Sequence, residues 1–410
     1  MSKRRLADQS HLDLNSGDLR FGHLFLCALC VLCGECLCLA GDLNPPPGAP
    51  APTPGPEPRI AINATNTPGD SDSRFRIGQP GSYYLAGNAT GEAAKSGIEI
   101  GASNVTIDLN GFTLQGVPGS LDGIRAGGGV IANITVRNGV VAGFGADGIS
   151  LCQSGLEKGV LVESVHASGN AGTGISVPTS SIVRNCTANN NSDGINTCDH
   201  CVIESCTARE NADDGITASD YSIIRGSAAV SNISSGMFAG EGSVIEACIS
   251  DQNGAQGILT GFGCTVRNCT SRGNGVYGIA AGGQSNVSGC TASANTLDGI
   301  NVGDNCTVLH NTCDGNGAGS GDGAGIHATG AGNHIEGNNC GHNDRGIDVD
   351  NFRNVIIRNY CFVNTTDWTI VANNNFGPII DRRNPMTAAV NGFSAAAALG
   401  STDPNANFSY

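Results

Sequence analysis

Near the carboxyl end of the chain, polar side chains recur at the spacing of a structural repeat. Asn301, His327 and Asp348 each stand two residues after a glycine, and Arg345 and Asp350 flank the last of them. A histidine beside an aspartate can act as a general base or a metal ligand, and an arginine can neutralise a uronate carboxylate. We therefore predict His327, Asp348 and Arg345 as catalytic candidates, and Asn301 and Asp350 as substrate-binding candidates.

Histidines are concentrated in the same region. Four of the eight histidines fall between residues 310 and 342, namely His310, His327, His334 and His342. A solvated outer face of a folded domain would also carry residues of these types. The sequence leaves both interpretations open.

A second set of charged residues lies near the start of the folded region. Glu99 and Arg125 stand at the same place after their glycines, which predicts a simple ion pair, and Asp122 and Asp147 lie beside them. Aspartate also precedes glycine in later repeats, at Asp193, Asp214 and Asp298. Converging carboxylates can bind calcium, but an Asp-Gly pair by itself indicates a turn. The sequence does not determine a cofactor, and calcium is the ion that it brings into consideration.

The elements that must position these residues follow from an internal repeat. A glycine followed by isoleucine, or in one case by methionine, occurs twelve times, and between Gly174 and Gly299 the spacing is 20 or 21 residues. The twelve pairs begin at Gly97, Gly123, Gly148, Gly174, Gly194, Gly215, Gly236, Gly257, Gly278, Gly299, Gly325 and Gly346. A near-constant period of this length indicates a solenoid.

Each repeat predicts three short strands. Buried-type residues stand one and three places after each glycine with mostly polar residues between them, which is the alternation of a strand with one buried face. Two further strands are expected in each repeat, as at residues 201–203 and 206–208. Such strands bury their inward faces only by stacking on their copies, so we predict an all-β, right-handed parallel β-helix of about 12 to 13 coils.

Two residue columns predict how the coils stay in register. Asparagine stands four places before successive glycines, where it suits a left-handed turn and its amide can bond the next asparagine. These residues are Asn170, Asn190, Asn211, Asn232, Asn253, Asn274 and Asn295. In a second column the charge alternates, so that opposite charges lie over one another. Its members are Asp108, Arg137, Glu163, Arg184, Glu204, Arg225, Glu246 and Arg267.

The cysteines fit the same columns. Cys198, Cys201 and Cys206 have the spacing of a metal cluster, but the last two belong to inward columns that cannot all turn toward one ion. Stacked pairs such as Cys186/Cys206 or Cys269/Cys290 suit disulfides in an exported protein, and buried thiols equally well.

The repeat resembles the right-handed parallel β-helix repeat family, the pectin-lyase-like superfamily, over residues 81–375. The segments GSYYLAGN at 81–88, NVTIDLNG at 104–111 and DPNANFS at 403–409 are similar to secreted bacterial members without a settled activity. The resemblance implies a fold and frequently carbohydrate binding or cleavage. Lyases of this superfamily typically use a lysine or arginine base with calcium. Here the regular coils lack an outward lysine, and the Asp-Pro-His-Glu signature of alginate epimerases is absent.

Two functions remain open on these grounds. The first is a β-helix that binds or processes a carbohydrate, and the second is a non-catalytic structural or adhesive rod. The turns from Gly174 to Gly299 are minimal, so a deep groove is expected only near either end of the stack. The sequence does not decide whether the protein is an enzyme, which polysaccharide it would meet or its oligomeric state.

The composition and the terminal segments limit where the protein acts and which partners it binds. The net charge of −15 argues against nucleic acid and against holding a polyuronate without a cation. Three early basic residues followed by an apolar run at 21–40 predict a cleavable secretory signal, or a membrane anchor if the segment is not removed. We expect an export segment at 1–40, a Pro-rich linker at 41–58, the β-helix at 59–375 and a capping tail at 376–410. The protein would then be secreted, periplasmic or on the cell surface.

Overall fold

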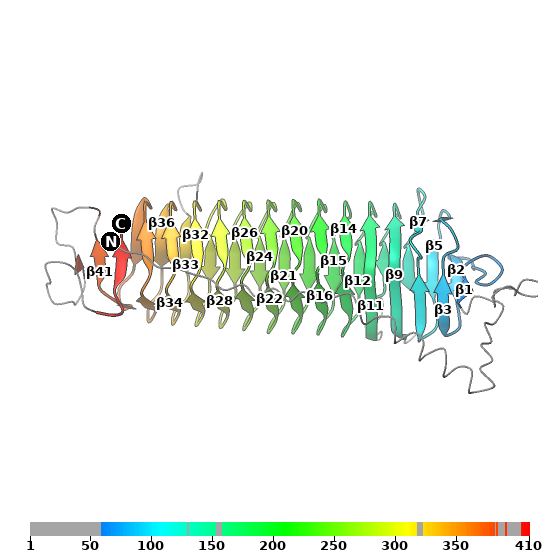
Figure 1. Ribbon diagram of the computed structural model, residues 1–410, viewed down its shortest axis with the longest axis horizontal. Coiled ribbons are helices and arrows are strands. Elements are labelled where there is room, and N and C mark those ends of the chain that lie inside the picture. Colours follow the sequence, from blue (N-terminus) through cyan, green and yellow to red (C-terminus); the bar gives the residue numbers. More distant parts are fainter. Residues whose placement is uncertain are drawn as a thin grey trace, which may run out of the picture. The chain divides into compact units, whose positions relative to one another are not determined.

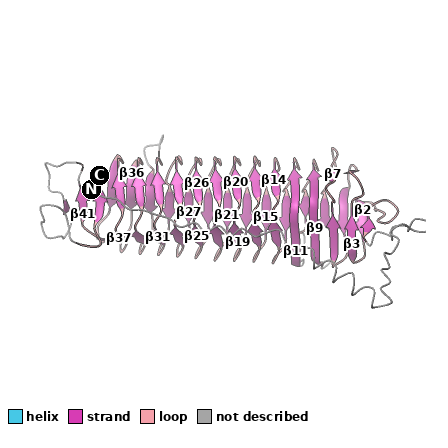
Figure 2. Cartoon of the chain, in the orientation of Figure 1, coloured by secondary structure: helices cyan, strands magenta, loops and turns pink. Residues whose placement is uncertain are grey.

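The computed structural model describes residues 59–128, 131–152, 158–317, 323–381, 383, 390–391 and 403–410. The expected export segment and linker lie outside these residues. The described residues fall within one compact unit, Pro58–Tyr410, and contain strands and turns but no helix (Figure 1, Figure 2). Among them there is accordingly no helix long and apolar enough to cross a membrane.

The glycine-aliphatic repeats form one parallel sheet of 14 strands. Ile175 pairs with Ile195, which pairs with Ile216, and all three side chains are fully buried. The strands are β2 (Ser73–Ile77), β5 (Ser96–Ile100), β8 (Ile124–Ala126), β10 (Ile149–Ser150), β12 (Ile175–Val177), β15 (Ile195–Thr197), β18 (Ile216–Ala218), β21 (Met237–Ala239), β24 (Ile258–Thr260), β27 (Ile279–Ala281), β30 (Ile300–Val302), β33 (Ala324–Ala328), β36 (Arg345–Val349) and β39 (Thr366–Ile370). The predicted parallel β-helix is confirmed.

The stack is longer than the twelve glycine repeats because each end adds a strand without the repeat's dipeptide. Phe75 in β2 pairs with Ile98, and Trp368 in β39 pairs with Ile347. Arg74 and Asp367 precede these aromatic residues in place of glycine. An aromatic side chain at an end strand covers more of the open core than an aliphatic one.

The other two strands of each coil join into a second sheet of 29 strands, because β9 and β11 are long enough to occupy both positions. The second position holds β1 (Ile60–Ala61), β3 (Gly81–Tyr84), β6 (Val105–Asp108), β9 (Ala132–Ala142), β11 (Lys158–Ser168), β13 (Ile182–Arg184), β16 (Val202–Glu204), β19 (Ile223–Arg225), β22 (Val244–Glu246), β25 (Thr265–Arg267), β28 (Asn286–Ser288), β31 (Thr307–Leu309), β34 (His334–Glu336), β37 (Val355–Ile357) and β40 (Asn375–Phe376). The third holds β4 (Ala89–Thr90), β7 (Thr113–Gln115), β14 (Thr187–Asn189), β17 (Thr207–Arg209), β20 (Ala228–Val230), β23 (Ile249–Asp251), β26 (Thr270–Arg272), β29 (Thr291–Ser293), β32 (Thr312–Asp314), β35 (Asn339–Gly341) and β38 (Tyr360–Phe362). The strands expected at 201–203 and 206–208 thus begin one residue later, as β16 and β17.

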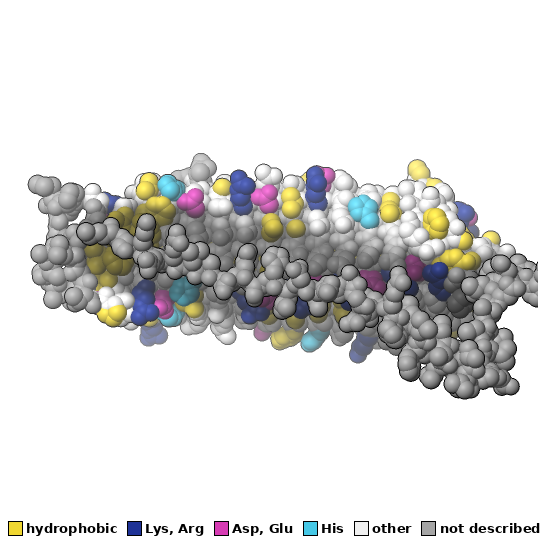
Figure 3. Space-filling view, viewed as in Figure 1, with side chains coloured by type: hydrophobic (Ala, Val, Ile, Leu, Met, Phe, Trp, Pro, Cys, Tyr) yellow, Lys and Arg dark blue, Asp and Glu magenta, His cyan; other side chains and the backbone are white. Residues whose placement is uncertain are grey.

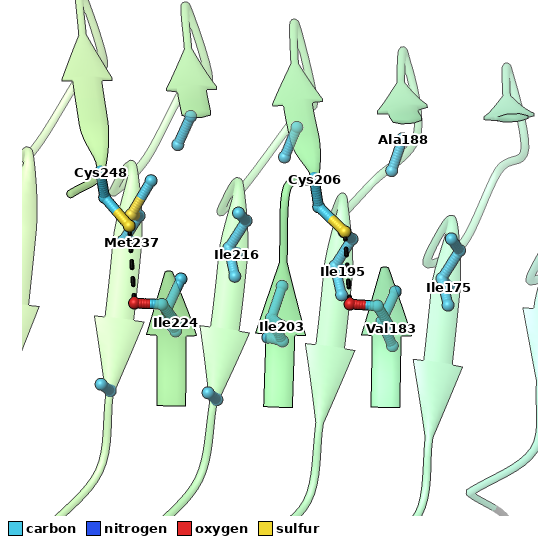
Figure 4. Packing of buried hydrophobic residues seen from close by; sticks show 14 of the residues in the cluster. Ile175, Val183, Ala188, Ile195, Ile203, Cys206, Ile216, Ile224, Met237 and Cys248 are labelled. Carbon is cyan, nitrogen blue, oxygen red and sulfur yellow. Dashed lines mark hydrogen bonds between the residues drawn. The ribbon is translucent and has the colours of Figure 1, made fainter. Parts of the chain in front are cut away.

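The core contains aliphatic side chains and buried thiols. Figure 4 shows Cys206 and Cys248 facing the aliphatic column, with their Sγ atoms 3.5 Å from the backbone carbonyls of Val183 and Ile224. The neighbouring Cys269 thiol and burial raise the pKa of Cys248 well above its ordinary value, so this thiol stays protonated. The buried cysteines that the structure describes fill the core, and none of them belongs to a group of converging metal-ligand atoms.

A buried asparagine ladder runs beside this core. Asn191 Oδ1 accepts hydrogen bonds from the backbone N–H and the amide of Asn170, both at 3.0 Å. The ladder contains Asn170, Asn191, Asn211, Asn232, Asn253, Asn274, Asn295, Asn316, Asn343 and Asn364. The prediction that Asn190 belongs to it is wrong, because the turn before Gly194 is one residue shorter than its neighbours. Asn190 is exposed instead, with a φ of 56°.

The left-handed conformation belongs to the residue before each ladder asparagine rather than to the asparagine itself. Glu210, Ser231 and Gln252 have φ values of 54°, 56° and 56°. The turn therefore places the following amide inside the coil, where it bonds the next one. The sequence analysis assigned both the left-handed turn and the amide bond to one asparagine. In the structure the asparagine forms the amide bond, and the residue before it adopts the left-handed turn.

The alternating charges form separate pairs. Arg184 contacts Glu163 at 2.6 Å, and Arg225 contacts Glu204 at 3.0 Å. The other two pairs are Arg137–Asp108 at 3.2 Å and Arg267–Glu246 at 2.8 Å. On the face seen in Figure 3, charged side chains of both signs are scattered in small groups, without a basic stripe among the described residues.

The C-terminal strands continue the stack. In the described part of the tail, β43 (Asn407–Ser409) pairs with β38 and with β41 (Ile379–Asp381), and β42 (Val390–Asn391) pairs antiparallel with β41. Asn407 Oδ1 accepts from the backbone of Asn359, and Trp368 Nε1 donates to Ser409 Oγ at 2.7 Å. The strand pairings and the Asn359 bond occupy backbone groups that would otherwise form an open sheet edge.

Candidate functional site

Three adjacent strands bring the predicted site residues onto one face. Asn301 in β30 pairs with His327 in β33, which pairs with Asp348 in β36. The flanking residues of β30, Ile300 and Val302, are buried, so strand alternation turns Asn301 outward. His327 likewise lies between buried neighbours and is half-buried itself.

His327 is held between two carboxylates. Its Nδ1 lies 3.0 Å from Asp298 Oδ2, and its Nε2 lies 3.0 Å from Asp350 Oδ2. The Asn301 amide donates to the same Asp298 oxygen at 2.8 Å. Asp298 is 2% exposed, and its other oxygen accepts the backbone N–H of Ala324 at 2.8 Å. Asp298 therefore fixes the ring orientation of His327 and the position of Asn301 together.

Asp298 was predicted only as part of an Asp-Gly turn, and this interpretation missed its place in the site. Asp214 Oδ1 accepts the Ser235 N–H at 2.8 Å, so aspartates before glycine serve as backbone acceptors between coils. Asp298 has this role and also bonds His327 through its second oxygen. The sequence signal that could have placed Asp298 in the site is its spacing, because Asn301 follows it by three residues.

Asp348 and Arg345 form a tight pair beneath the histidine. Arg345 Nη1 donates to Asp348 Oδ2 at 2.5 Å, and His327 Nε2 lies 4.0 Å from that oxygen. The Asp348 side chain is 1% exposed, and its Oδ1 has no hydrogen-bond partner among the described residues. A buried carboxylate needs a counter-charge, and Arg345 supplies it. Arg345 is thus engaged with Asp348, and its predicted contact to a uronate carboxylate stays a prediction.

The carboxylates set the charge of His327. Burial lowers the pKa of the imidazole, but hydrogen bonding to Asp298 and its charge, together with Asp350 and Asp348, outweigh burial and raise the pKa from 6.5 to about 9. The raised pKa favours the protonated ring at neutral pH, a state in which His327 can donate a proton.

One group of atoms at this site could hold a metal ion. The ligand atoms of His327, Asp348 and Asp350 all lie within 4.8 Å of one another. The bond from the other ring nitrogen to Asp298 is the arrangement that orients metal-binding histidines. A nitrogen ligand suits zinc or another transition metal better than calcium, which prefers oxygen. Binding would require His327 to lose its proton.

The other histidines lie apart from this site. His334 is in β34 of the second sheet, 3.0 Å from Glu336. His342 follows β35 and contacts Asp314 at 2.8 Å, and His310 is a left-handed turn residue. Closeness in sequence does not unite these three with His327, because successive segments of one coil occupy different faces.

Charged residues near the start of the stack neutralise one another. Glu99 accepts hydrogen bonds from Arg125 at 2.5 Å and from Arg76 at 3.0 Å, and Arg125 also contacts Asp72. The predicted ion pair is therefore part of a larger group. Asp70, Asp72 and Glu99 are close enough to share a cation, but these two arginines already supply positive charge there.

Three hollows in the described surface lie away from the His327 site. One of about 440 Å³ lies by Phe75 and Leu85 near the first coils, and one of about 240 Å³ lies by Phe376 near the last coils. A third, of about 190 Å³, is lined by His342 and Asp344. None of these three is lined by His327.

Comparisons with known proteins concern the fold. The family model described as "Right handed beta helix region" matches residues 257–395, which confirms the resemblance to right-handed β-helix proteins. No curated protein matches the chain. The A-module of Azotobacter vinelandii mannuronan C-5 epimerase AlgE4 is similar at 15% identity and a TM-score of 0.47, covering 72% of this chain and 90% of that one.

Two further solved structures have the same kind of likeness. The Dettilon tailspike protein has 15% identity and a TM-score of 0.38, covering 74% of this chain and 58% of the tailspike. A mutant of the periplasmic alginate epimerase AlgG has 12% identity and a TM-score of 0.40, covering 77% and 81%.

Proposed function

We propose that this right-handed parallel β-helix protein binds a neutral carbohydrate on the face formed by Asn301, His327 and Asp350. The observation that carries the proposal is the ring of His327 held between the carboxylates of Asp298 and Asp350, which raise its pKa. A sugar offers hydroxyl groups that both donate and accept. A face carrying an N–H cation, an amide and a carboxylate within a few ångströms can satisfy both kinds of bond.

Charge at the site favours neutral sugars over polyuronates. Three carboxylates stand against one imidazolium and one guanidinium, which leaves one negative charge. Arg345 is taken up by Asp348. The whole chain carries a net charge of −15, which adds to the repulsion of a polyanion. A polyuronate would therefore need a bridging cation such as calcium.

If the bound sugar reacts, His327 is the group suited to act. Its raised pKa of about 9 keeps a proton on the ring at neutral pH, which it can donate to a leaving oxygen. Asp298 would stabilise the ring orientation while Asp350 faces solvent, with its side chain 57% exposed. In this proposal His327 is the proton donor, Asp298 its positioning residue and Asp350 a contact to the sugar.

A non-catalytic adhesive rod is the second candidate. The minimal turns between Gly174 and Gly299 favour it, because glycan-processing sites usually enclose the reacting sugar. Binding is common to both candidates, and only turnover separates them. Export through residues 1–40 is part of either proposal, because an extracellular polysaccharide is met only outside the cell.

A glycan panel tests the proposal. Neutral glycans and polyuronates are measured for binding and for chain cleavage, with and without calcium, on the wild type and H327Q and D350N. We expect binding of a neutral glycan that weakens at least tenfold in both variants. H334Q is the matched control, because His334 faces another side of the stack and should leave binding unchanged. Lack of binding across the panel, or full binding by H327Q, would contradict the proposal.

A further inference from the structure

Two cysteines differ from all other described cysteines. Cys152 and Cys198 are half-buried, whereas the remaining described cysteines are buried: Cys186, Cys201, Cys206, Cys248, Cys264, Cys269, Cys290, Cys306, Cys313, Cys340 and Cys361. Oxidants and thiol reagents reach exposed sulfur far more readily than buried sulfur. Cys152 and Cys198 are therefore the pair open to chemistry.

The chain brings these two cysteines together from different coils. Cys152 follows β10 and Cys198 follows β15, and β12 lies between those strands. Two coils in a regular stack would separate the residues by about 9.6 Å, too far for a disulfide. β10 has only two residues, the fewest of any strand in its sheet, and Cys152 lies just beyond it. The two cysteine side chains nevertheless meet across the coil of β12.

The sulfur atoms are already in contact. Cys152 Sγ lies 2.7 Å from Cys198 Sγ. Non-bonded heavy atoms pack at roughly 3.5–4.0 Å, so the two sulfurs are closer than separate thiols would pack. By contrast, the buried Cys201 thiol is directed at a backbone carbonyl, that of Pro178, at 3.2 Å.

We propose that Cys152 and Cys198 form a disulfide that joins the coil of β10 to the coil of β15. The two thiols lose two protons and two electrons as one S–S bond forms. A small-molecule disulfide accepts the electrons and becomes two thiols, so the exchange balances. This site is not one of the stacked pairs expected from the sequence, Cys186/Cys206 and Cys269/Cys290, and it does not depend on the proposed function.

Peptide mapping of the full chain tests the proposal. The protein is incubated with glutathione disulfide, alkylated, digested without reduction and analysed by mass spectrometry. We expect one cross-linked pair of peptides, containing Cys152 and Cys198, with a mass about 2 Da below the sum of the two thiol peptides. C152S and C198S should each abolish it. C201S is the matched control, because serine occupies the same column at Ser222 and Ser243, and the cross-link should persist.

The outcomes are distinct. Independent alkylation of Cys152 and Cys198 after oxidation would overturn the proposal, as would a cross-link confined to Cys186 and Cys206. Thermal unfolding supplies a second measurement: reduction should lower the Tm of the oxidised wild type and leave the Tm of C152S unchanged. An equal effect of reduction on both proteins would also contradict the cross-link.

Discussion

Replacing one asparagine of the buried ladder should destabilise the β-helix far more than replacing its neighbour. In Asn191→Ala the backbone N–H of Asn170 loses its acceptor, and the bonds from Asn191 Nδ2 to Ala167 O at 3.1 Å and to Asn211 Oδ1 at 3.4 Å disappear. One orphaned buried donor costs about 1–3 kcal/mol and each of the two lost bonds about 0.5–1.5 kcal/mol, so we expect a loss of about 2–6 kcal/mol.

Asn190→Gly is the matched control for this substitution. Asn190 is exposed and left-handed, and glycine adopts that conformation without strain, so the change should cost less than about 1 kcal/mol. Urea unfolding followed by circular dichroism measures both variants, with the midpoint compared at constant slope. Equal losses for the two variants, or a loss below about 0.5 kcal/mol in Asn191→Ala, would refute the ladder argument.

The remaining predictions concern charges. Because the pKa of His327 is raised from 6.5 to about 9 in the folded protein, its contribution to stability is fully present below pH 6.5 and is lost as the pH rises through about 9. Urea midpoints from pH 6 to 10 should show this loss in the wild type but not in H327Q, and a His327 NMR titration should give a lower pKa in D298N. R225E places like charges beside Glu204, so it should lower the thermal midpoint at low salt, and 1 M salt should restore most of that loss. A midpoint that does not respond to salt would contradict the charge-register argument.

The fold was predictable because its determinants are local and repeated. The Gly-aliphatic column marks every inward strand from β5 to β36, and the structure confirms its register. Counting back from each glycine gave the wrong ladder asparagine where a coil changed length, as at Asn190. A one-residue deletion in a turn leaves the strands unaltered but shifts the position of the asparagine relative to the glycine. The glycine pattern also missed the end strands β2 and β39, in which Phe75 and Trp368 occupy the place of the aliphatic residue.

The site was only partly predictable, because contacts within it depend on side-chain reach. The outward column brought Asn301, His327 and Asp348 together, since register alone places them. Strand register does not predict that the Arg345 side chain contacts the buried Asp348, or that the Asp298 side chain contacts His327. Those contacts raise the pKa of His327, and its proposed role as a proton donor depends on them.

Hydrogen–deuterium exchange with a bound neutral glycan tests most directly whether the His327 face contacts carbohydrate. The account predicts slowed exchange in peptides covering β30, β33 and β36, with little change in the regular coils from β12 to β24, and loss of this protection in H327Q. Protection confined to the regular coils, or protection of β33 that persists unchanged in H327Q, would contradict it.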